Sequence, residues 1–337
     1  MSREPDFPNL LRILRREATQ KPALFELFMN WPVYRLFSGR SAGSEDPLEI
    51  LKWQVEAYAA GGYDYVGYHA CSMQFPTGKR HQGDTISLNE GACITDWESF
   101  RSYPWPDPDQ FDYSRFDRIA PYLPKGMKLM AFGPNGVLEN VIGLVGYDRL
   151  CYLLYEDPDL AQAVFDAVGS RMVRYYENAV SFPTVGMLMS NDDWGFNTQT
   201  FLSPSMMRQY LFPWHKKIVG VAHNAGMPAL LHSCGNLEAV MEDVIEDMGY
   251  DGKHSYEDNI LPVEEAYRRW GDRIAILGGV DLDFLVRQPV ESIRTRCENL
   301  LDMTREKGGY LLGSGNSIPE YVPMDHYLAM VDLVRNG

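Results

Sequence analysis

The sequence has no apolar run approaching the ~20 residues that a helix needs to cross a bilayer. It also has no clustered basic stretch, because the longest basic groupings, at residues 12–16 and 215–217, lie within helical patterns. A nucleic-acid-binding protein needs a basic face, and an anionic membrane surface repels a chain whose formal net charge is −15. Residues 1–16 are polar and charged, unlike a secretory signal. We therefore expect a cytoplasmic protein that binds neither nucleic acid nor a membrane.

Cysteine is scarce, and its spacing suggests no pairing. The five cysteines are an odd number and include no Cys-x-x-Cys pair, which indicates free thiols in a reducing compartment. No low-complexity linker and no shift in composition divides the 337 residues. With 45% hydrophobic and 23% charged residues, the chain has enough material for one sizeable core. We therefore expect a single domain.

Strand-length apolar runs alternate with helical patterns through the second half of the chain. Five runs are predicted as strands, at residues 186–190, 228–234, 250–255, 273–277 and 309–312. A helix is expected after each, and the clearest begins at Ser203-Pro204, an N-cap followed by proline at the first helical position. The next is expected to begin at Asn236, and the others near residues 262, 290 and 323. This regular spacing is typical of parallel βαβ units.

The first half supplies three more predicted strands, at residues 23–29, 63–68 and 128–132. Helices are expected from Asp46-Pro47 and from Asp157-Pro158, the latter within a helix-rich stretch at 137–181. Residues 70–113 carry many turn formers and aromatics and are expected to form a long loop insertion. Eight strands alternating with helices predict an α/β protein with a single-domain (β/α)8 TIM barrel. A doubly wound open sheet is the alternative.

Polar residues recur where the predicted strands end. In a (β/α)8 barrel these carboxyl ends and the loops after them build the active site. The strand-end residues are Glu26, Asn30, Tyr68, His69, Asn135, Asp192, Asp193, His232, Cys234, Lys253, His254, Asp281, Ser314 and Asn316. Their common position predicts one polar site at the mouth of the barrel.

His232 and Cys234 are two residues apart on a predicted strand, so their side chains should point to one face. Imidazole nitrogen and thiolate sulfur are ligands that zinc favours. The alternative is a hydrogen-bonded histidine beside a small buried cysteine. We take both residues as candidate metal ligands.

Asp192 and Asp193 follow another strand, and at most one of them should face the site because strand side chains alternate. A carboxylate there could bind metal or act as a general acid, or it could cap a helix. His254 could relay protons, and Asp281, after two glycines, could face a ligand or cap a helix. Asp192, Asp193, His254 and Asp281 are the candidate catalytic residues.

Four further strand-end residues are candidates for substrate binding. Lys253 could bind an anionic group, although it could equally pair with a neighbouring acid. Glu26, Asn135 and Asn316 offer polar groups at other strand ends. All four are expected near the mouth of the barrel.

The segment at residues 231–236, Leu-His-Ser-Cys-Gly-Asn, resembles the central motif of the uroporphyrinogen decarboxylase superfamily. The resemblance extends to residues 194–204, 276–281 and 313–319, and it is weakest before residue 120. It implies a (β/α)8 barrel. Members of this superfamily are decarboxylases or corrinoid-linked methyltransferases, which move a methyl group between methylcobalamin and a thiol or tetrahydrofolate.

The sequence departs from both branches. Decarboxylases of the superfamily carry an arginine-rich stretch after the first strand, which holds substrate carboxylates, but residues 30–37 here read Asn-Trp-Pro-Val-Tyr-Arg-Leu-Phe. The thiol methyltransferases bind zinc through His-x-Cys and a later cysteine, and that later position is Asn316 here. A zinc site would therefore need a carboxylate from Asp192, Asp193 or Glu26 as its third ligand.

The resemblance implies a methyltransferase that uses cobalamin as methyl carrier and a thiol or tetrahydrofolate-type acceptor. The missing third sulfur favours a folate-type or unknown acceptor. Cobalamin would arrive free or on a small corrinoid protein, because no Asp-x-His-x-x-Gly corrinoid motif is present. A decarboxylase of a smaller substrate is one alternative, and a non-catalytic barrel that binds a metal or small ligand is another.

Overall fold

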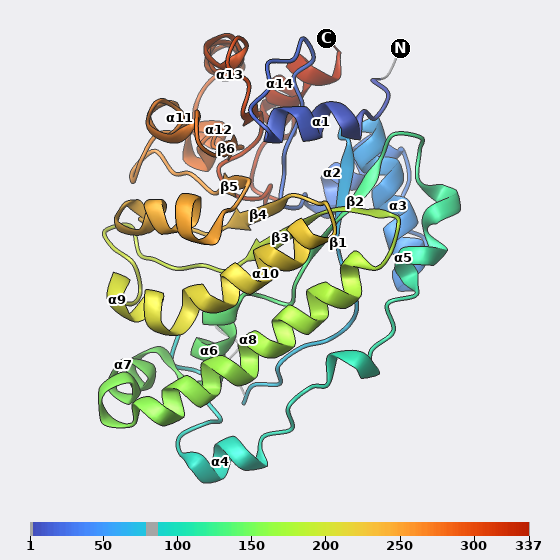
Figure 1. Ribbon diagram of the computed structural model, residues 1–337. Coiled ribbons are helices and arrows are strands. Elements are labelled where there is room, and N and C mark those ends of the chain that lie inside the picture. Colours follow the sequence, from blue (N-terminus) through green and yellow to red (C-terminus); the bar gives the residue numbers. More distant parts are fainter. Residues whose placement is uncertain (1–2, 79–86, 337) are drawn as a thin grey trace.

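The computed structural model describes residues 3–78 and 87–336 and is built around one parallel sheet (Figure 1). Within the described residues the sheet has seven strands, and each pairs with the next in chain order. They are β1 (Tyr65–His69), β2 (Lys128–Phe132), β3 (Val185–Asn191), β4 (Ala229–His232), β5 (Gly252–His254), β6 (Ala275–Leu277) and β7 (Tyr310–Leu311). Because every strand runs the same way, all carboxyl ends lie at one edge of the sheet.

Helices connect the strands and cover the outer side of the sheet (Figure 1). The α-helices are α1 (Phe7–Leu14), α2 (Trp31–Ser38), α3 (Pro47–Ala60), α4 (Trp97–Ser102), α5 (Arg115–Arg118), α6 (Val137–Val145), α7 (Tyr147–Glu156), α8 (Pro158–Val180), α9 (Pro204–Met206), α10 (Phe212–Asn224), α11 (Val263–Trp270), α12 (Leu282–Arg287), α13 (Val290–Thr304) and α14 (Met324–Arg335). Short 3-10 or π segments are η1 (Pro108–Gln110), η2 (Ala120–Tyr122), η3 (Met207–Leu211), η4 (Glu238–Val240) and η5 (Asp243–Met248).

The helices that the sequence predicts to begin at a capping residue followed by proline do begin there. The Ser203 hydroxyl accepts a hydrogen bond from the Met206 amide, and the Asp157 carboxylate accepts one from the Leu160 amide. The helix expected from Asn236 is present as an irregular run at residues 238–248, with 3-10 geometry in η4 and π geometry in η5, and Val240 and Val244 are buried as the pattern predicts. No helix among the described residues is both long enough and apolar enough to cross a membrane.

The predicted closed barrel of eight strands is only partly formed, because residues 23–29 are not a full strand. They pair with the last strand segment through the bridges Leu24–Leu312 and Met29–Ile318 and through two backbone hydrogen bonds to Leu312. Toward β1 the contact is a side chain, since the Tyr65 hydroxyl accepts from the Glu26 amide and donates to the Glu26 carbonyl. The phenol takes the place of ladder hydrogen bonds there, so the sheet does not close continuously.

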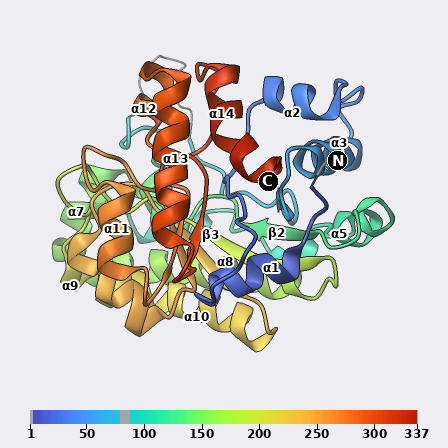
Figure 2. The same cartoon turned by 90° about the horizontal axis from the view of Figure 1, so that it is seen from above.

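The loop insertion expected at residues 70–113 is largely irregular in its described part, with only α4 and η1 as regular segments. Residues 79–86 of this insertion lie outside the described residues. In Figure 1 the insertion crosses the lower part of the view, away from the two chain ends. The first and last described segments lie near one another, since residues 3–6 and 334–335 line the same pocket (Figure 2).

We predict that Gly313→Ala destabilises the protein by about 3 kcal/mol or more, because a Cβ at Gly313 would lie 1.7 Å from the Phe25 carbonyl oxygen. The new methyl group would push residues 23–29 off β7. Urea unfolding followed by circular dichroism measures the change. Gly220→Ala in α10 is the matched control, since nothing lies within 4 Å of its Cβ position, and this change should be neutral or slightly stabilising. Equal stability of the two variants would contradict the prediction.

Candidate functional site

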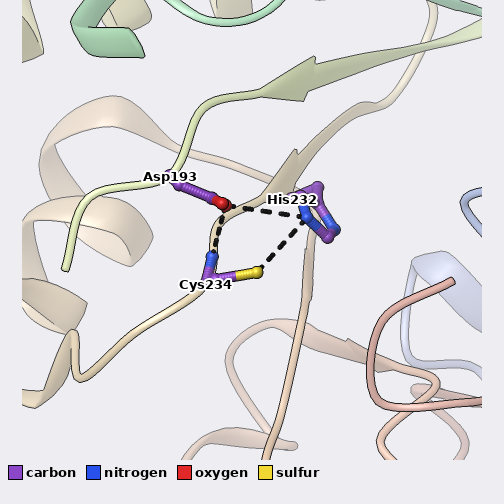
Figure 3. Close-up of side chains that lie close together, drawn as sticks. All are labelled: Asp193, His232 and Cys234. Atoms are coloured by element: carbon purple, nitrogen blue, oxygen red, sulfur yellow. Dashed lines mark hydrogen bonds and ion pairs between the residues drawn. The ribbon is translucent and has the colours of Figure 1, made fainter. Parts of the chain in front are cut away.

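Asp193, His232 and Cys234 lie together at the carboxyl ends of β3 and β4 (Figure 3). The Cys234 sulfur is 3.6 Å from Nε2 of His232, and Oδ1 of Asp193 is 3.7 Å from the same nitrogen. One potential ligand atom from each side chain lies within 4.8 Å of the others. The Cys234 backbone amide donates to Oδ1 of Asp193 at 2.8 Å, which holds the two loops together. The three side chains could therefore bind a single metal ion.

Burial shapes the protonation of these three residues. Burial, and secondarily the charge of Lys253, lowers the pKa of His232 to about 3, so its imidazole is neutral. Burial and the Asp193 charge raise the pKa of the Cys234 thiol well above its usual range. Burial also raises the pKa of Asp193. Without a cation the pocket opposes negative charge, whereas a divalent cation would stabilise both anionic ligands.

A chain of hydrogen bonds fixes the tautomer of His232. The Ser314 carbonyl oxygen lies 3.1 Å from Nε2 of His254, so that nitrogen must carry the proton and donate it. Burial lowers the pKa of His254, so the ring is neutral and its Nδ1 is an acceptor. That atom lies 2.8 Å from Nδ1 of His232, which must therefore donate. The Nε2 lone pair of His232 is left facing Asp193 and Cys234, as metal coordination requires.

Glu26 supports the far end of this chain. Its two carboxyl oxygens contact the Ser314 amide at 2.8 Å and the Ser314 hydroxyl at 2.6 Å. Burial raises the pKa of Glu26 to about 8, against the opposing effect of these hydrogen bonds. Glu26 thus lies inside the barrel and acts through Ser314 and His254. It does not lie with the three candidate ligands, so it is not the carboxylate that completes a metal site.

Asn316 and Ser255 surround the Cys234 sulfur. The Asn316 side-chain amide donates to Sγ at 3.3 Å, whereas the Ser255 hydroxyl, which donates to the Gly315 carbonyl, accepts from the Cys234 thiol at 3.8 Å. A hydrogen bond donated to sulfur stabilises a thiolate, so Asn316 supports the Cys234 sulfur and is not itself a ligand. One thiolate, one neutral imidazole and one carboxylate form a donor set that suits zinc and leaves a fourth position open.

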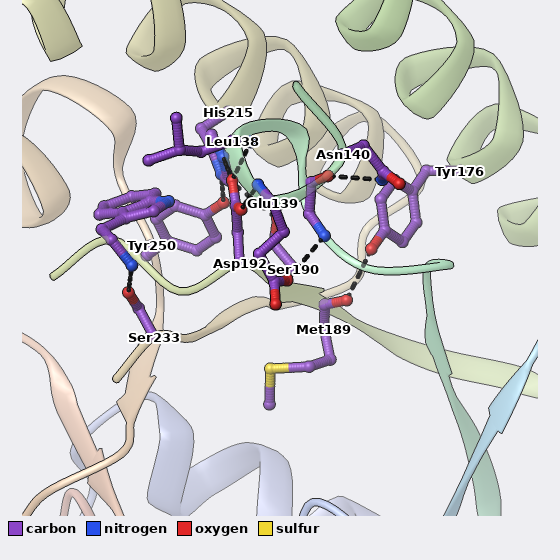
Figure 4. Close-up of polar contacts among 12 residues, drawn as sticks. Leu138, Glu139, Asn140, Tyr176, Met189, Ser190, Asp192, His215, Ser233 and Tyr250 are labelled. Carbon is purple, nitrogen blue, oxygen red and sulfur yellow. Dashed lines mark hydrogen bonds and ion pairs between the residues drawn. The ribbon is translucent and has the colours of Figure 1, made fainter. Parts of the chain in front are cut away.

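Asp192 is not part of this group, and its carboxylate instead lies at the start of α6, beside His215 (Figure 4). Its carboxylate accepts hydrogen bonds from the Leu138 and Glu139 amides, both 3.0 Å long, at the start of α6. It also contacts Nε2 of His215 at 2.8 Å, and the other nitrogen of that ring contacts the Tyr250 hydroxyl at 2.7 Å. The alternation along β3 separates the two aspartates, so the expectation of a catalytic Asp192 is replaced by a structural role.

Three other candidates lie at the predicted edge but outside the group of ligands. Asp281 caps α12 by accepting from the Phe284 amide, and it also accepts from the Asp258 amide, so its capping alternative holds. Lys253 lies on the opposite face of β5 from His254 and donates to the Ser255 carbonyl. Its ammonium lies 4.2 Å from the centre of the Tyr256 ring, and burial lowers its pKa to about 8. Asn135 is exposed after β2.

The residues that sequence reasoning did not single out are Ser255, Glu139 and the His215–Tyr250 pair. Glu139 is the third residue of α6 and contacts the Gly136 amide through its side chain at 3.0 Å. A glutamate three residues after a helix start is the usual capping signal, so the sequence could have revealed it. His215 and Tyr250 carry no such signal, because their partner Asp192 is distant in sequence.

The parallel α/β sheet and the polar group at its carboxyl edge define a TIM-barrel-like enzyme architecture. The family model described as Uroporphyrinogen decarboxylase (URO-D) matches residues 117–337. This is about two thirds of the chain, and the chain belongs to this family.

Relatives of known name agree with this assignment at low identity. Uroporphyrinogen decarboxylase from Coxiella burnetii (strain Dugway 5J108-111) is 25% identical over 191 residues, which cover 55% of this chain and 49% of the relative. The enzyme of the same name from Anaeromyxobacter sp. (strain Fw109-5) is 24% identical over 205 residues, covering 60% of this chain and 56% of the relative. The chain thus matches about half the length of these curated relatives.

A solved structure matches nearly the whole chain. It is titled a methyltransferase from Methanosarcina mazei, covers 99% of each chain, and has a TM-score of 0.70 at 18% identity. At this identity the likeness establishes the fold. The likeness in fold extends over the part of the chain that the family model leaves unmatched.

We predict that the two neighbouring aspartates separate stability from metal binding. Asp192→Asn should lower the free energy of unfolding by about 3 kcal/mol, because an amide cannot accept from the helix amides and His215 together. Asp193→Asn should leave stability nearly unchanged, since the amide oxygen of asparagine can still accept from the Cys234 amide, but should weaken zinc binding by at least about 100-fold. Chelator competition and urea unfolding measure the two effects. The reverse pattern would refute the assignment.

We also predict that zinc affinity rises by about tenfold per pH unit between pH 6 and 8. Binding must displace the Cys234 proton, because the pKa of that thiol is raised, whereas His232 is already neutral above about pH 3. Cys234→Ala should abolish both binding and this pH dependence. The control is Cys151→Ala, on α7 away from the site. Zinc binding that survives Cys234→Ala would exclude the sulfur as a ligand.

Proposed function

We propose that the protein is a metal-dependent methyltransferase that transfers a methyl group from a corrinoid to a thiol or tetrahydrofolate-type acceptor. The observation that carries this proposal is the group formed by Asp193, His232 and Cys234, whose donor atoms lie within 4.8 Å of one another, with the Asp193 side chain 38% exposed. The name of the Methanosarcina mazei relative supports the same reaction class. The family provides both alternatives, methyl transfer and decarboxylation.

Each residue has a distinct task in this proposal. His232 presents its Nε2 lone pair, held there by His254 and the Ser314 carbonyl. Cys234 supplies an anionic sulfur that receives a hydrogen bond from Asn316. When bound, zinc would hold the acceptor sulfur as a thiolate at the open fourth position and so increase its nucleophilicity. Asp193 provides the second negative charge, so two anionic ligands balance the charge of a divalent ion.

The presence of the Asp193 carboxylate removes the reason to prefer a folate-type acceptor over a thiol, which was the absence of a cysteine at position 316. With Asp193 in the group, the number of protein ligands needed for an open tetrahedral site is met without a cysteine at position 316. A thiol acceptor is therefore as well served as a folate-type acceptor. For the latter, the buried Lys253, with its pKa lowered to about 8, is a group that could control a proton.

Decarboxylation of a tetrapyrrole is disfavoured by the segment after residues 23–29. Residues Trp31–Ser38 form α2, and its single arginine, Arg35, is exposed to solvent. No arginine pair from this segment can therefore meet the carboxylates of a buried substrate. A buried carboxylate without a partner costs several kcal/mol, about the stability of a weak complex.

The proposal is tested by incubating the zinc-loaded protein with methylcobalamin and either a thiol or tetrahydrofolate. Formation of cob(I)alamin, followed by its absorbance under anaerobic conditions, and of the methylated acceptor is expected. Asp193→Asn and Cys234→Ala should each lower the rate by at least about 100-fold, while Cys151→Ala should not. Transfer that is unaffected by these two variants would refute the role of the metal site, and no transfer with any acceptor would refute the function.

A second prediction concerns the decarboxylase alternative. Uroporphyrinogen should not be consumed at a rate within 1,000-fold, on the order of 4 kcal/mol in barrier, of an authentic decarboxylase. Liquid chromatography of the porphyrin products, after oxidation, measures this. Turnover at a comparable rate would show that the substrate carboxylates are held by residues outside α2.

A further inference from the structure

A second polar cavity of about 520 Å3 lies beside the candidate metal site, at the carboxyl ends of β1 and β2. Its walls include Tyr68 and His69 from β1, Asn135 after β2, Glu139 in α6 and Arg115 in α5. The described lining also includes residues of the loop insertion between Cys71 and Thr77. A cavity of this size can hold a small molecule.

Arg115 is the cation of this cavity. Its guanidinium carbon lies 5.4 Å from the centre of the Tyr68 ring, a cation–π arrangement that orients the group. Among the described residues no ion pair includes Arg115, although Arg174, Arg208 and Arg296 each pair with carboxylates within 3 Å. The guanidinium interacts with the Tyr68 hydroxyl and with the charge of Asp112, but it has no paired carboxylate among the described residues, so the donors that do not face Tyr68 are available for a ligand in the cavity.

Glu139 is the acidic residue in the described lining, and its side chain is engaged at the start of α6. One of its oxygens accepts from the Gly136 amide at 3.0 Å. Among the residues that the structure describes, Glu139 and Arg115 form no ion pair, so Arg115 is the charged donor that a ligand in the cavity would meet.

Asn135, on the wall of this cavity, has a left-handed backbone conformation. Its φ angle is 59°, in the left-handed region that few residues other than glycine adopt, and asparagine is among those that tolerate it. The residue is exposed on the cavity wall, and no hydrogen bond of its side chain is present among the described residues. Strained backbone of this kind concentrates at ligand sites.

We propose that this cavity binds the anionic group of a small molecule, a carboxylate, sulfonate or phosphate, through Arg115. Asn135 provides a neutral amide beside the anion. The identity of that molecule as a methyl donor or acceptor rests on the proposed function, but the anion site itself does not. Asn135 follows β2 and the candidate metal ligands follow β3 and β4, so the cavity and these ligands lie along the same carboxyl edge of the sheet. A substrate with its anionic group at Arg115 and its reacting atom at the candidate metal ligands would span both sites.

Two fluorinated probes test the site directly. Trifluoroacetate carries the charge and 2,2,2-trifluoroethanol does not, and fluorine NMR line broadening measures the binding of each to the full chain. We expect trifluoroacetate to bind, to be displaced by phosphate or methanesulfonate, and to bind at least fivefold more weakly to Arg115→Gln. Trifluoroethanol should not distinguish the two proteins. The displacing anions also show which anion chemistry the cavity prefers.

Arg118→Gln is the matched control, since it removes the same charge from the same helix, at an exposed position outside the cavity lining. It should bind trifluoroacetate like the unchanged protein, and Arg115→Lys should recover part of the affinity. Equal binding by Arg115→Gln, or an equal loss in Arg118→Gln, would overturn the proposal. Thermal unfolding of each variant shows whether it is folded.

Cys234→Ala separates this proposal from the proposed function. If the anion binds at Arg115, removing the metal ligand should leave trifluoroacetate binding unchanged. Loss of the probe in Cys234→Ala would place the anion on the metal and refute the Arg115 site. An intact probe site in a protein that transfers no methyl group would refute only the function.

Discussion

The hydrogen bond between the two buried imidazoles, His232 and His254, is the contact on which the candidate site depends. Both rings are neutral, and the Ser314 carbonyl determines which nitrogen of His254 carries a proton. The Ser314 carbonyl therefore determines, through His254, that His232 offers its Nε2 lone pair to a ligand. Because Glu26 holds Ser314, residues from the first and last segments of the barrel determine the chemistry at β4.

The two aspartates after β3 show how one strand can serve two purposes. Asp192 stabilises the start of α6 and orients His215 behind the sheet, while Asp193 joins the candidate ligands at the mouth. The positions of Asp192 and Asp193 depend on each other, because neighbouring side chains of an extended backbone point to opposite sides. The same helix start also carries Glu139, so the candidate metal site and the cation-lined cavity share one structural support.

The sequence predicted the parallel strand–helix order and the polar residues at strand ends, since both follow from periodicity and cap residues. It also limited the candidates for a third metal ligand to Asp192, Asp193 or Glu26, but it could not choose among them. In the sequence, a carboxylate that caps a helix and a carboxylate that binds a metal both simply follow a strand. The incomplete closure was not predictable, because it depends on the Tyr65 side chain replacing backbone hydrogen bonds. Arg115 and its cavity lie beside an irregular insertion, where no periodic pattern indicates which side chains meet.

The pairing of residues 23–29 with β7 also constrains when the barrel can be completed during synthesis. Glu26 and Ser314 are 288 residues apart in sequence. At a translation rate of about 5–20 residues per second, the amino-terminal segment waits roughly 15–60 s for its partner. During that time the apolar side chains of Leu24 and Phe25, fully buried in the finished protein, have no β7 to pack against. The nascent chain would thus expose a site for chaperones until its last strand leaves the ribosome.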